Sequence, residues 1–344
     1  MIRWPQESRT LESLPLLTLY LSERCNSRCV TCDYWRTGTK DMSLASVRRL
    51  LPSLERLGTQ VALLSGGEPL LNPEWQQIAA ALRDARLKLW LLTSGLSLAK
   101  HAREVARLFD RVTVSLDGTD AATYQAIRGL DAFDKVCEGI RAAAAAGAPV
   151  TLRVTLQRAN FRQLPEFVRL ARHLGAQGVS FLAVDVANPH AFGRKDAIGS
   201  DLALRTEDLS PFAALLDALE RDCAREFESG FIAESPRRLR HIHRYFSAVS
   251  GQGDYPLVRC NAPAFSAVLD AGGRVHPCFF IQGPPQAVAR EDLALTLNDL
   301  PSLALRERIR SNGAPECRTC VCSIWHTRGP TEVMPPLSRE PGHV

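Results

Sequence analysis

The sequence predicts an α/β fold with a parallel sheet, and three observations lead to this prediction. Between residues 14 and 185, short apolar stretches typical of buried strands alternate with stretches of helical spacing. Capping and turn residues separate these stretches, as in strand–helix units whose strands run parallel. The cycle repeats six times, which is too few for a closed eight-unit barrel. The pattern therefore fits a doubly wound sheet or an open, partial barrel.

Each expected element has a local justification. Ser43 is expected to cap the first long helix, Asn72 to cap the second with Pro73 at its first position, and Gly147 to follow the end of the fifth. The expected strands cover residues 16–22, 60–65, 87–93, 111–116, 150–156 and 178–184. The expected helices cover residues 43–57, 73–85, 99–109, 120–127, 133–146 and 164–174.

After residue 185 the pattern changes, which suggests a different organisation. Residues 187–200 have the composition of a loop, and two helices are expected at 209–228 and 236–249. Beyond a turn-rich linker at 251–254, the sequence predicts a hairpin and a further helix, with strands at 266–269 and 275–280 and the helix at 303–309. We therefore expect an N-terminal extension (1–13), an α/β domain (14–185), a helical connection (186–255), a second module (256–330) and a tail (331–344).

The overall composition is that of an ordinary globular protein. The chain has 344 residues, of which 45% are hydrophobic and 23% charged, with a formal net charge of +5. This charge is too small to indicate nucleic-acid binding. No run of about 18 apolar residues is present, and the polar N-terminus has no signal-peptide core, so we expect a cytoplasmic protein that binds no membrane.

Ten cysteines are the unusual feature of the composition. In a chain that is neither short nor visibly secreted, many cysteines indicate metal or redox chemistry rather than disulfides. Eight of the ten fall into two groups near the two ends, whereas Cys137 and Cys223 lie between them and are expected to be core residues.

The first group, Cys25, Cys29 and Cys32, has the spacing C-x3-C-x2-C directly after the first expected strand. Thiolates are soft ligands that suit an iron–sulfur cluster or zinc. Three thiolates leave one position of a four-iron cluster open for another ligand. A zinc site normally has a fourth protein ligand, and none is obvious nearby.

The stretch CNSRCVTCDYW resembles the cluster motif of the radical S-adenosylmethionine (SAM) enzymes, and companion motifs follow later strands. Residues 65–69 (SGGEP) look like the family's GGEP motif, 93–95 (TSG) its TNG, and 115–118 (SLDG) its SxDG. The resemblance covers about residues 14–185 and implies a partial (β/α)6 TIM-like barrel with a [4Fe–4S] cluster. It implies SAM contacts from the residues at these positions, namely Gly66, Gly67, Glu68, Ser94, Ser115, Asp117 and Arg153.

One position departs from the family pattern, and the companion motifs also have simpler interpretations. The family usually has an aromatic residue before the third cysteine, where this chain has Thr31, so Tyr34 or Trp35 is a candidate for the adenine contact. Taken alone, the two glycines are a plain strand-to-helix turn, the SLDG residues are turn residues, and an arginine at position 153 pairs with a carboxylate.

The second group begins with Cys260 and Cys278, and the C-x2-C pair Cys317 and Cys320 completes four thiols. The spacing alone allows zinc or an iron–sulfur cluster. Beside the first motif, it resembles the α+β extension called SPASM, or its shortened twitch form, which implies one auxiliary [4Fe–4S] cluster. Cys322 is an alternative fourth ligand, and a structural zinc knuckle is the other interpretation of the group.

The resemblance implies reductive cleavage of SAM to a 5′-deoxyadenosyl radical that abstracts hydrogen from a substrate. The short N-terminal extension favours a small-molecule substrate, or a recognition partner that is supplied separately. A peptide-modifying maturase of the same superfamily is the alternative. A non-catalytic iron–sulfur or zinc protein is the alternative from another functional class. Three further sets of polar residues are candidates for contacts with a partner or a substrate. Each set can equally be an ordinary solvent-exposed loop or helix face. They are Arg24, Arg28 and Arg36 for a flavodoxin or ferredoxin, Asp185, Asn188, His190 and Arg194 for substrate, and a basic helix with Arg237–Arg240, His241 and His243.

Overall fold

The computed structural model describes residues 10–196, 198–289 and 292–325. Its centre is one sheet with the strand order β6-β5-β4-β3-β2-β1-β7-β8. Each of the first six strands pairs in parallel with the next along the chain, which confirms the α/β class and the six-stranded partial barrel. The strands are β1 (Leu16–Ser22), β2 (Val61–Gly66), β3 (Lys88–Thr93), β4 (Arg111–Ser115), β5 (Val150–Leu156), β6 (Gly178–Ala183), β7 (Ser266–Leu269) and β8 (Val275–His276).

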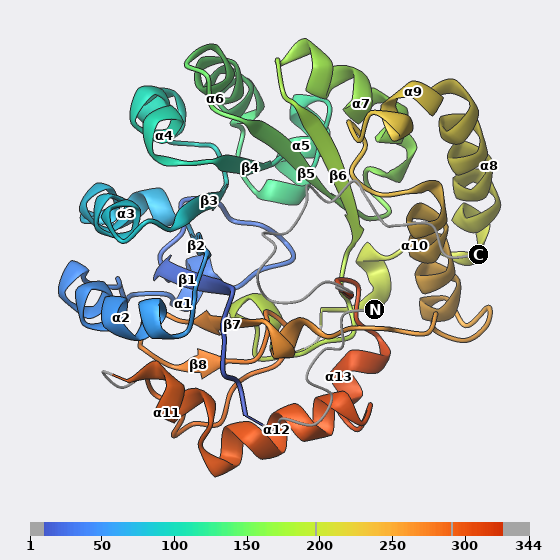
Figure 1. Cartoon of the computed structure of the whole chain (residues 1–344). Helices are drawn as coiled ribbons and strands as arrows, with labels where there is room; N and C mark the ends of the chain where they lie inside the picture. The colour runs from blue at the N-terminus through green and yellow to red at the C-terminus, as the bar shows by residue number, and fades with distance from the viewer. Residues whose placement is uncertain (1–9, 197, 290–291, 326–344) are drawn as a thin grey trace.

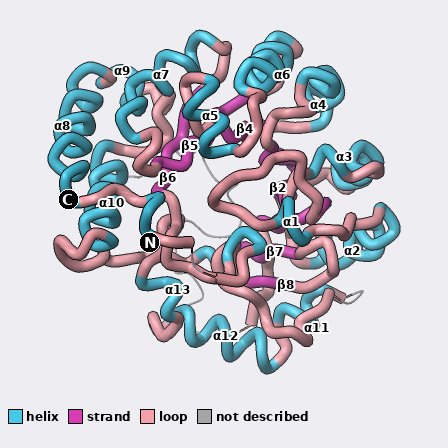
Figure 2. The backbone as a smooth tube through the Cα atoms, turned by 180° about the vertical axis from the view of Figure 1, so that it is seen from behind, coloured by secondary structure: helices cyan, strands magenta, loops and turns pink. Residues whose placement is uncertain are grey.

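Helices surround the strands on the outside, as Figures 1 and 2 show from opposite sides. The α-helices are α1 (Tyr34–Thr37), α2 (Leu44–Arg56), α3 (Trp75–Asp84), α4 (Ala102–Leu108), α5 (Ala121–Arg128), α6 (Phe133–Ala145), α7 (Leu164–His173), α8 (Thr206–Asp222), α9 (Ala224–Glu228), α10 (Pro236–Val249), α11 (Leu293–Leu297), α12 (Leu300–Arg310) and α13 (Pro315–Arg318). Short 3-10 turns occur at Pro69–Leu71, Ala99–His101, Phe161–Gln163, Ala191–Gly193, Ser200–Leu202 and Ala262–Ala264. No helix in the described part of the chain is both long and apolar enough to cross a membrane.

The alternation of side chains along the strands places the core between sheet and helices. In β5, Val150, Leu152 and Val154 are fully buried, whereas the residues between them are half-buried on the opposite face. The apolar faces of α3 and α7 pack against the sheet in the same way, with residues such as Ile78 and Phe167 at zero exposure. The opposite face of β5 carries its polar side chains, which are half-buried.

Two helix ends correct the expectations drawn from the sequence. The second helix was expected at 73–85 with Asn72 as its cap, but α3 begins at Trp75. Asn72 Oδ1 accepts from the Glu74 N–H at 2.8 Å in the turn before α3, and its Nδ2 donates to the carbonyls of Leu21 and Met42. The side chain therefore serves the entry of the helix and also holds neighbouring loops together. The expected helix 209–228 begins earlier, at Thr206, and breaks at Cys223 into α8 and α9.

The C-terminal hairpin is part of the main sheet rather than a separate sheet. β7 pairs in parallel with β1 over Leu16–Leu19 and Ser266–Leu269, and β8 pairs antiparallel with β7. The expected strand 275–280 is shorter, because β8 ends at His276 and an isolated bridge joins Cys278 to Ile281. The expected helix 303–309 lies inside α12. The second cysteine segment therefore starts at the open edge of the barrel, beside β1.

The two cysteines between the groups lie in or beside the core. Cys137 is buried in α6, as expected. Cys223 is half-buried at the junction of α8 and α9, where it packs against the core rather than inside it. The tail 331–344 and the N-terminal residues 1–9 lie outside the described residues.

Candidate functional site

The first cysteine group lies in the loop between β1 and α1, beyond the carboxyl end of a central strand. All ten cysteines of the chain are free thiols, and these three are half-buried. Burial raises the pKa of Cys25 to about 11 and that of Cys32 to about 12, and each thiol also interacts with others of the group. Thiols must lose their protons to bind a metal, so these buried thiolates need positive charge close by, from the metal itself and from neighbouring cations.

The SGGEP segment packs directly against this loop. The backbone N–H of Gly67 donates to the Ser22 carbonyl at 2.7 Å, and that of Glu68 donates to the Arg24 carbonyl at 2.8 Å. A Cβ atom at Gly66 would lie 2.4 Å from the Ser22 oxygen, and one at Gly67 would lie 2.4 Å from the Arg24 oxygen. Gly66 also has a φ of 120°, a conformation that favours glycine. Both glycines are therefore required for close contact with the cysteine loop.

Glu68 and Ser94 come together in the structure. Glu68 is fully buried, and its carboxylate accepts hydrogen bonds from the Ser94 N–H at 2.7 Å and the Ser94 hydroxyl at 2.6 Å. The same carboxylate accepts from the Thr93 hydroxyl and from the Leu70 N–H. Ser94 Oγ also lies 3.2 Å from Asn26 Oδ1, in the cysteine loop. The carboxylate of Glu68 thus holds the end of β3 against the loop, and its expected contact with SAM stays a prediction.

Ser115, Asp117 and Arg153 lie at the ends of β4 and β5. Ser115 and Arg153 are register partners of the two strands. Asp117 is buried, accepts from the Thr155 N–H at 2.7 Å and forms an ion pair with Arg128 at 3.1 Å. Burial raises the pKa of Asp117 above its ordinary value. The Nε–H of Arg153 is buried and donates to no acceptor among the described residues. The charge of Arg153 also acts on the buried carboxyl of Glu234, whose pKa it lowers against the effect of burial, so the expected contact of Arg153 with SAM stays a prediction.

The second cysteine group is assembled from three segments. Cys260 precedes β7, Cys278 follows β8, and Cys317 and Cys320 lie in and after α13. Burial raises the pKa of Cys278 to about 12, and the thiols of Cys260 and Cys317 raise it further. Burial also raises the pKa of Cys320, and its neighbours include Cys278 and Cys260. The four expected ligands therefore lie close enough to interact electrostatically.

Cys322 lies at the edge of the second group. Its N–H donates to Cys320 Sγ at 3.4 Å. Burial raises the pKa of the Cys322 thiol, while the charges of Arg153 and Arg238 lower it. Cys322 therefore interacts with Arg153 of β5 and Arg238 of α10 as well as with Cys260, which distinguishes it from Cys320.

The loop after β6 connects the two groups. The Phe192 carbonyl accepts from the Asp33 N–H at 3.0 Å and from Cys32 Sγ at 3.3 Å. In the same loop, Asn188 Nδ2 donates to the Phe280 carbonyl at 2.6 Å, two residues after Cys278. Contact of this loop with substrate stays a prediction, and the structure shows that its polar residues hold the loop itself. Arg194, for example, is buried and donates to the carbonyls of Ala191 and Asp185.

Tyr20 is a residue that the sequence analysis missed. Its ring lies 5.9 Å from that of Tyr34 and 6.2 Å from that of Phe279. Burial raises the pKa of Tyr20, and Tyr34, Cys278 and Cys32 raise it further, so this phenol lies between the two cysteine groups. Its signal in the sequence is a tyrosine in a mostly apolar strand that ends at the cysteine loop.

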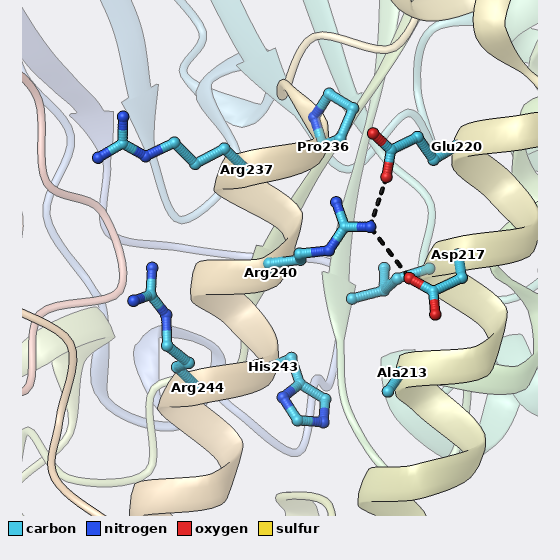
Figure 3. A pocket seen from close by; sticks show the side chains of 9 residues that line it. Ala213, Asp217, Glu220, Pro236, Arg237, Arg240, His243 and Arg244 are labelled. Atoms are coloured by element: carbon cyan, nitrogen blue, oxygen red, sulfur yellow. Dashed lines mark hydrogen bonds and ion pairs between the residues drawn. The ribbon is translucent and has the colours of Figure 1, made fainter.

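A groove of about 570 Å³ lies elsewhere, between α8 and α10 (Figure 3). Arg240 reaches across it to Asp217 at 3.0 Å and to Glu220 at 2.5 Å. His243 Nε2 lies 3.0 Å from the Leu209 carbonyl, and Arg238 donates to the Ser323 carbonyl. Part of the basic face expected on this helix therefore fastens α10 to its neighbours.

The described residues contain no group of three or more Cys, His, Asp or Glu side chains arranged around a single metal ion. A cluster differs from a single ion, because each thiolate binds a different iron. Both cysteine groups therefore keep their assignment as predictions.

Comparisons with known proteins agree with the motifs. Residues 19–171 match the family profile described as the radical SAM superfamily. GTP 3′,8-cyclase of Mycolicibacterium smegmatis is 32% identical over 277 residues, which cover 77% of this chain and 74% of the relative. Mycofactocin maturase MftC of Mycobacterium tuberculosis is 32% identical over 177 residues, 50% of this chain and 45% of that protein. The chain spans about half the length of several of its curated relatives.

Solved structures share the fold over most of the chain. Streptococcus suis SuiB bound to S-adenosylmethionine has a TM-score of 0.66 at 14% identity, and the match covers 96% of this chain and 78% of SuiB. The anSMEcpe structure with bound AdoMet has a TM-score of 0.62 at 16% identity, covering 89% of each chain. At these identities the likeness shows the fold alone.

Proposed function

This chain belongs to the radical SAM superfamily, and we propose that it holds a [4Fe–4S] cluster on Cys25, Cys29 and Cys32 and binds S-adenosylmethionine beside it. The observation that carries the proposal is the contact of this loop with the ends of β2, β3 and α5. Parallel α/β barrels place their active sites at this edge. The loop thus combines the required donor atoms with the usual position of such a site.

The residues at this site fit both the [4Fe–4S] cluster and S-adenosylmethionine. Three thiols supply soft ligands, and the SGGEP backbone lies too close to the loop to admit a side chain at Gly66 or Gly67. Buried donors without partners among the described residues include Arg128 Nε, Arg153 Nε and the Ser27 hydroxyl. Buried polar atoms normally have partners, so the unused donor of Arg128, whose charge acts on all three thiols, supports a negatively charged group at this loop.

When bound, the cluster and S-adenosylmethionine supply the chemistry, which is reductive cleavage of S-adenosylmethionine to methionine and a 5′-deoxyadenosyl radical. The chain's own residues orient and enclose them. Glu68 orients Ser94, and Arg153 offers a cation to a carboxylate. The rings of Tyr20, Tyr34 and Phe279 exclude water between the two cysteine groups. The substrate is expected in this enclosed region.

For the second group, we propose one auxiliary [4Fe–4S] cluster on Cys260, Cys278, Cys317 and Cys320. Their mutual electrostatic interactions support this ligand set. On this proposal, residues 14–185 form the SAM barrel, 186–255 the helical connection and 256–330 the auxiliary-cluster module. A flavodoxin or ferredoxin is the proposed reductant, received at the basic surface of the first cysteine loop, where Arg24 and Arg36 form exposed ion pairs with Asp41 and Asp33.

We propose a small molecule as the substrate. The relative that supports this proposal is the M. smegmatis GTP 3′,8-cyclase, which is named for a nucleotide substrate and whose match covers most of both chains. A peptide substrate is the second candidate, supported by the likeness to the mycofactocin maturase and by the structure of SuiB bound to its precursor peptide SuiA.

The test is anaerobic reconstitution of the full chain with iron and sulfide, followed by addition of S-adenosylmethionine and a reductant. We expect 5′-deoxyadenosine as a product and none above background from the variant in which Cys25, Cys29 and Cys32 are all alanine. Incubation with nucleotides and with candidate precursor peptides, read by mass change, separates the two substrate classes. Reconstituted protein that never cleaves S-adenosylmethionine, even with these substrates present, would indicate a non-catalytic metal protein and overturn the proposal.

A further inference from the structure

The end of α5 carries a buried arginine that the family motifs do not account for. We propose that Arg128 supplies the compensating positive charge of the first cysteine group, and that Asp117 sets how much of this charge the group experiences. This inference rests on the proposed function, because it concerns the cluster that the three cysteines would hold. Arg128 is then a positioning residue.

The burial and pairing of Arg128 are unusual for an arginine. The residue is 9% exposed, and its Nη1 donates to Asp117 Oδ2 at 3.1 Å. Its Nε–H is buried and has no acceptor among the described residues. Apart from Asp117, the neutral phenol of Tyr124 lies close enough to interact with the guanidinium. A buried guanidinium with an unused donor beside a single carboxylate can accommodate a further acceptor, and a negatively charged one suits it best. Asp117 accepts from Arg128 through Oδ2 and from the Thr155 N–H through Oδ1, and neither oxygen accepts from the Arg128 Nε–H.

Backbone contacts tie Arg128 to the cysteine loop. The Arg28 N–H donates to the Arg128 carbonyl and the Val30 N–H donates to the Ile127 carbonyl, both at 3.0 Å. A Cβ atom at Gly129 would lie 2.3 Å from the Arg28 oxygen, so the loop and the end of α5 are in close contact. Residues 28 and 30 lie on either side of Cys29. The guanidinium is therefore held at a constant place relative to that cysteine.

The charge of Arg128 reaches all three thiols. Burial raises the pKa of each, and Arg128 acts in the opposite direction on Cys25, Cys29 and Cys32. Cys29 is the thiol that most strongly favours the charged form of Arg128. The reduction potential of an iron–sulfur cluster depends on nearby charge and hydrogen bonds, because reduction adds negative charge to the cluster. A cation at this position favours the reduced cluster, and an anion opposes it.

Opposite substitutions test this charge balance. Arg128→Met removes the cation and Asp117→Asn removes the anion, while both nearly preserve side-chain size. The matched control is Arg162→Met, which breaks the Arg162–Asp208 pair at a distant position. The measurement is the reduction potential of the cluster signal that is lost in the Cys25, Cys29 and Cys32 alanine variant, followed by electron paramagnetic resonance in the reconstituted full chain.

We expect a more negative potential for Arg128→Met, a less negative one for Asp117→Asn and no change for Arg162→Met. Unchanged potentials, or shifts of both variants in the same direction, would overturn the inference. If Arg128→Met binds no iron at this site, restored iron binding in Arg128→Lys supports the inference, whereas failure of a folded Arg128→Lys overturns it. Failure of the unsubstituted protein to bind iron at these cysteines would instead overturn the proposed function.

Discussion

The two cysteine groups differ in how the chain holds them. The first lies within one loop, between residues 25 and 32, and the ends of β2, β3 and α5 hold this loop through backbone hydrogen bonds and buried side chains. The second brings together residues 260 to 322 from three segments around a two-stranded hairpin. The difference shows that a local motif and a tertiary assembly can present similar sets of thiols. It also implies that the two sites depend on different contacts.

The comparison is tested most strongly by removing the second group alone. Replacing Cys278 and Cys317 together with alanine is expected to lower the iron content from about eight atoms per chain to about four. Cleavage of S-adenosylmethionine should remain, because the first loop rests on other elements. Iron analysis and 5′-deoxyadenosine assays check this. A loss of cleavage comparable to that of the triple variant would show that the two groups are one functional unit. About four iron atoms and one zinc in the unsubstituted protein would indicate a zinc knuckle.

Within the second group, single substitutions separate the two candidate fourth ligands. Cys320→Ser is expected to lose up to about four iron atoms per chain, whereas Cys322→Ser should retain them. The reason is that the thiol of Cys320 interacts with Cys278 and Cys260, whereas Cys322 also faces Arg153 and Arg238. Iron counting after identical reconstitution is the measurement. The reverse result would exchange the roles of the two cysteines.

A smaller effect is expected from crowding the backbone in each region. Gly67→Ala places a methyl 2.4 Å from the Arg24 carbonyl, and Gly283→Ala places one 1.7 Å from the Val275 carbonyl. Each should lower the free energy of unfolding by about 1–3 kcal/mol in denaturant titrations. Only Gly67→Ala should also slow cleavage of S-adenosylmethionine. Gly199→Ala is the control, since its nearest neighbour would be a side-chain atom at 3.9 Å. If Gly67→Ala and Gly283→Ala slowed cleavage of S-adenosylmethionine equally, the two cysteine groups would not depend on different contacts.

The smallest effect concerns the turn between β7 and β8. Burial opposes ionisation of Asp270, but hydrogen bonds from His276, Arg274 N–H and Gly272 N–H hold its pKa below the ordinary value. Because the pKa of Asp270 is lower in the folded than in the unfolded protein, the ionised carboxylate stabilises the fold at pH values above the unfolded pKa of about 3.9. This stabilisation is lost as the pH falls through the pKa that Asp270 has in the folded protein.

Asp270→Asn should therefore lower the free energy of unfolding at neutral pH by roughly 1–2 kcal/mol and approach the parent at acid pH. Denaturant titrations at several pH values measure this. An equal difference at all pH values would contradict a role for the charge. Unchanged cleavage of S-adenosylmethionine in this variant would further separate the second region from the first.

Much of the barrel could be predicted from the sequence, because strands and helices there follow local patterns. Apolar runs such as 150–156 became β5 without change, and the Ser43 and Asp120 side chains cap α2 and α5. The departures occurred where a side chain had a distant partner. Besides accepting from the Glu74 N–H before α3, Asn72 donates to two distant carbonyls, and the polar loop after β6 binds its own backbone and the Phe280 carbonyl. Neither partner can be read from neighbouring positions.

By itself, the sequence determined the repeating strand–helix order, the three-cysteine loop after β1 and the glycines that follow β2, since each depends on residues close together in the chain. Only the tertiary structure decided that β7 extends the sheet beside β1, that Tyr20 lies between the two cysteine groups and that Arg128 pairs with Asp117. These features depend on the docking of segments far apart in the chain. Burial and electrostatics act between such segments only once folding brings them together.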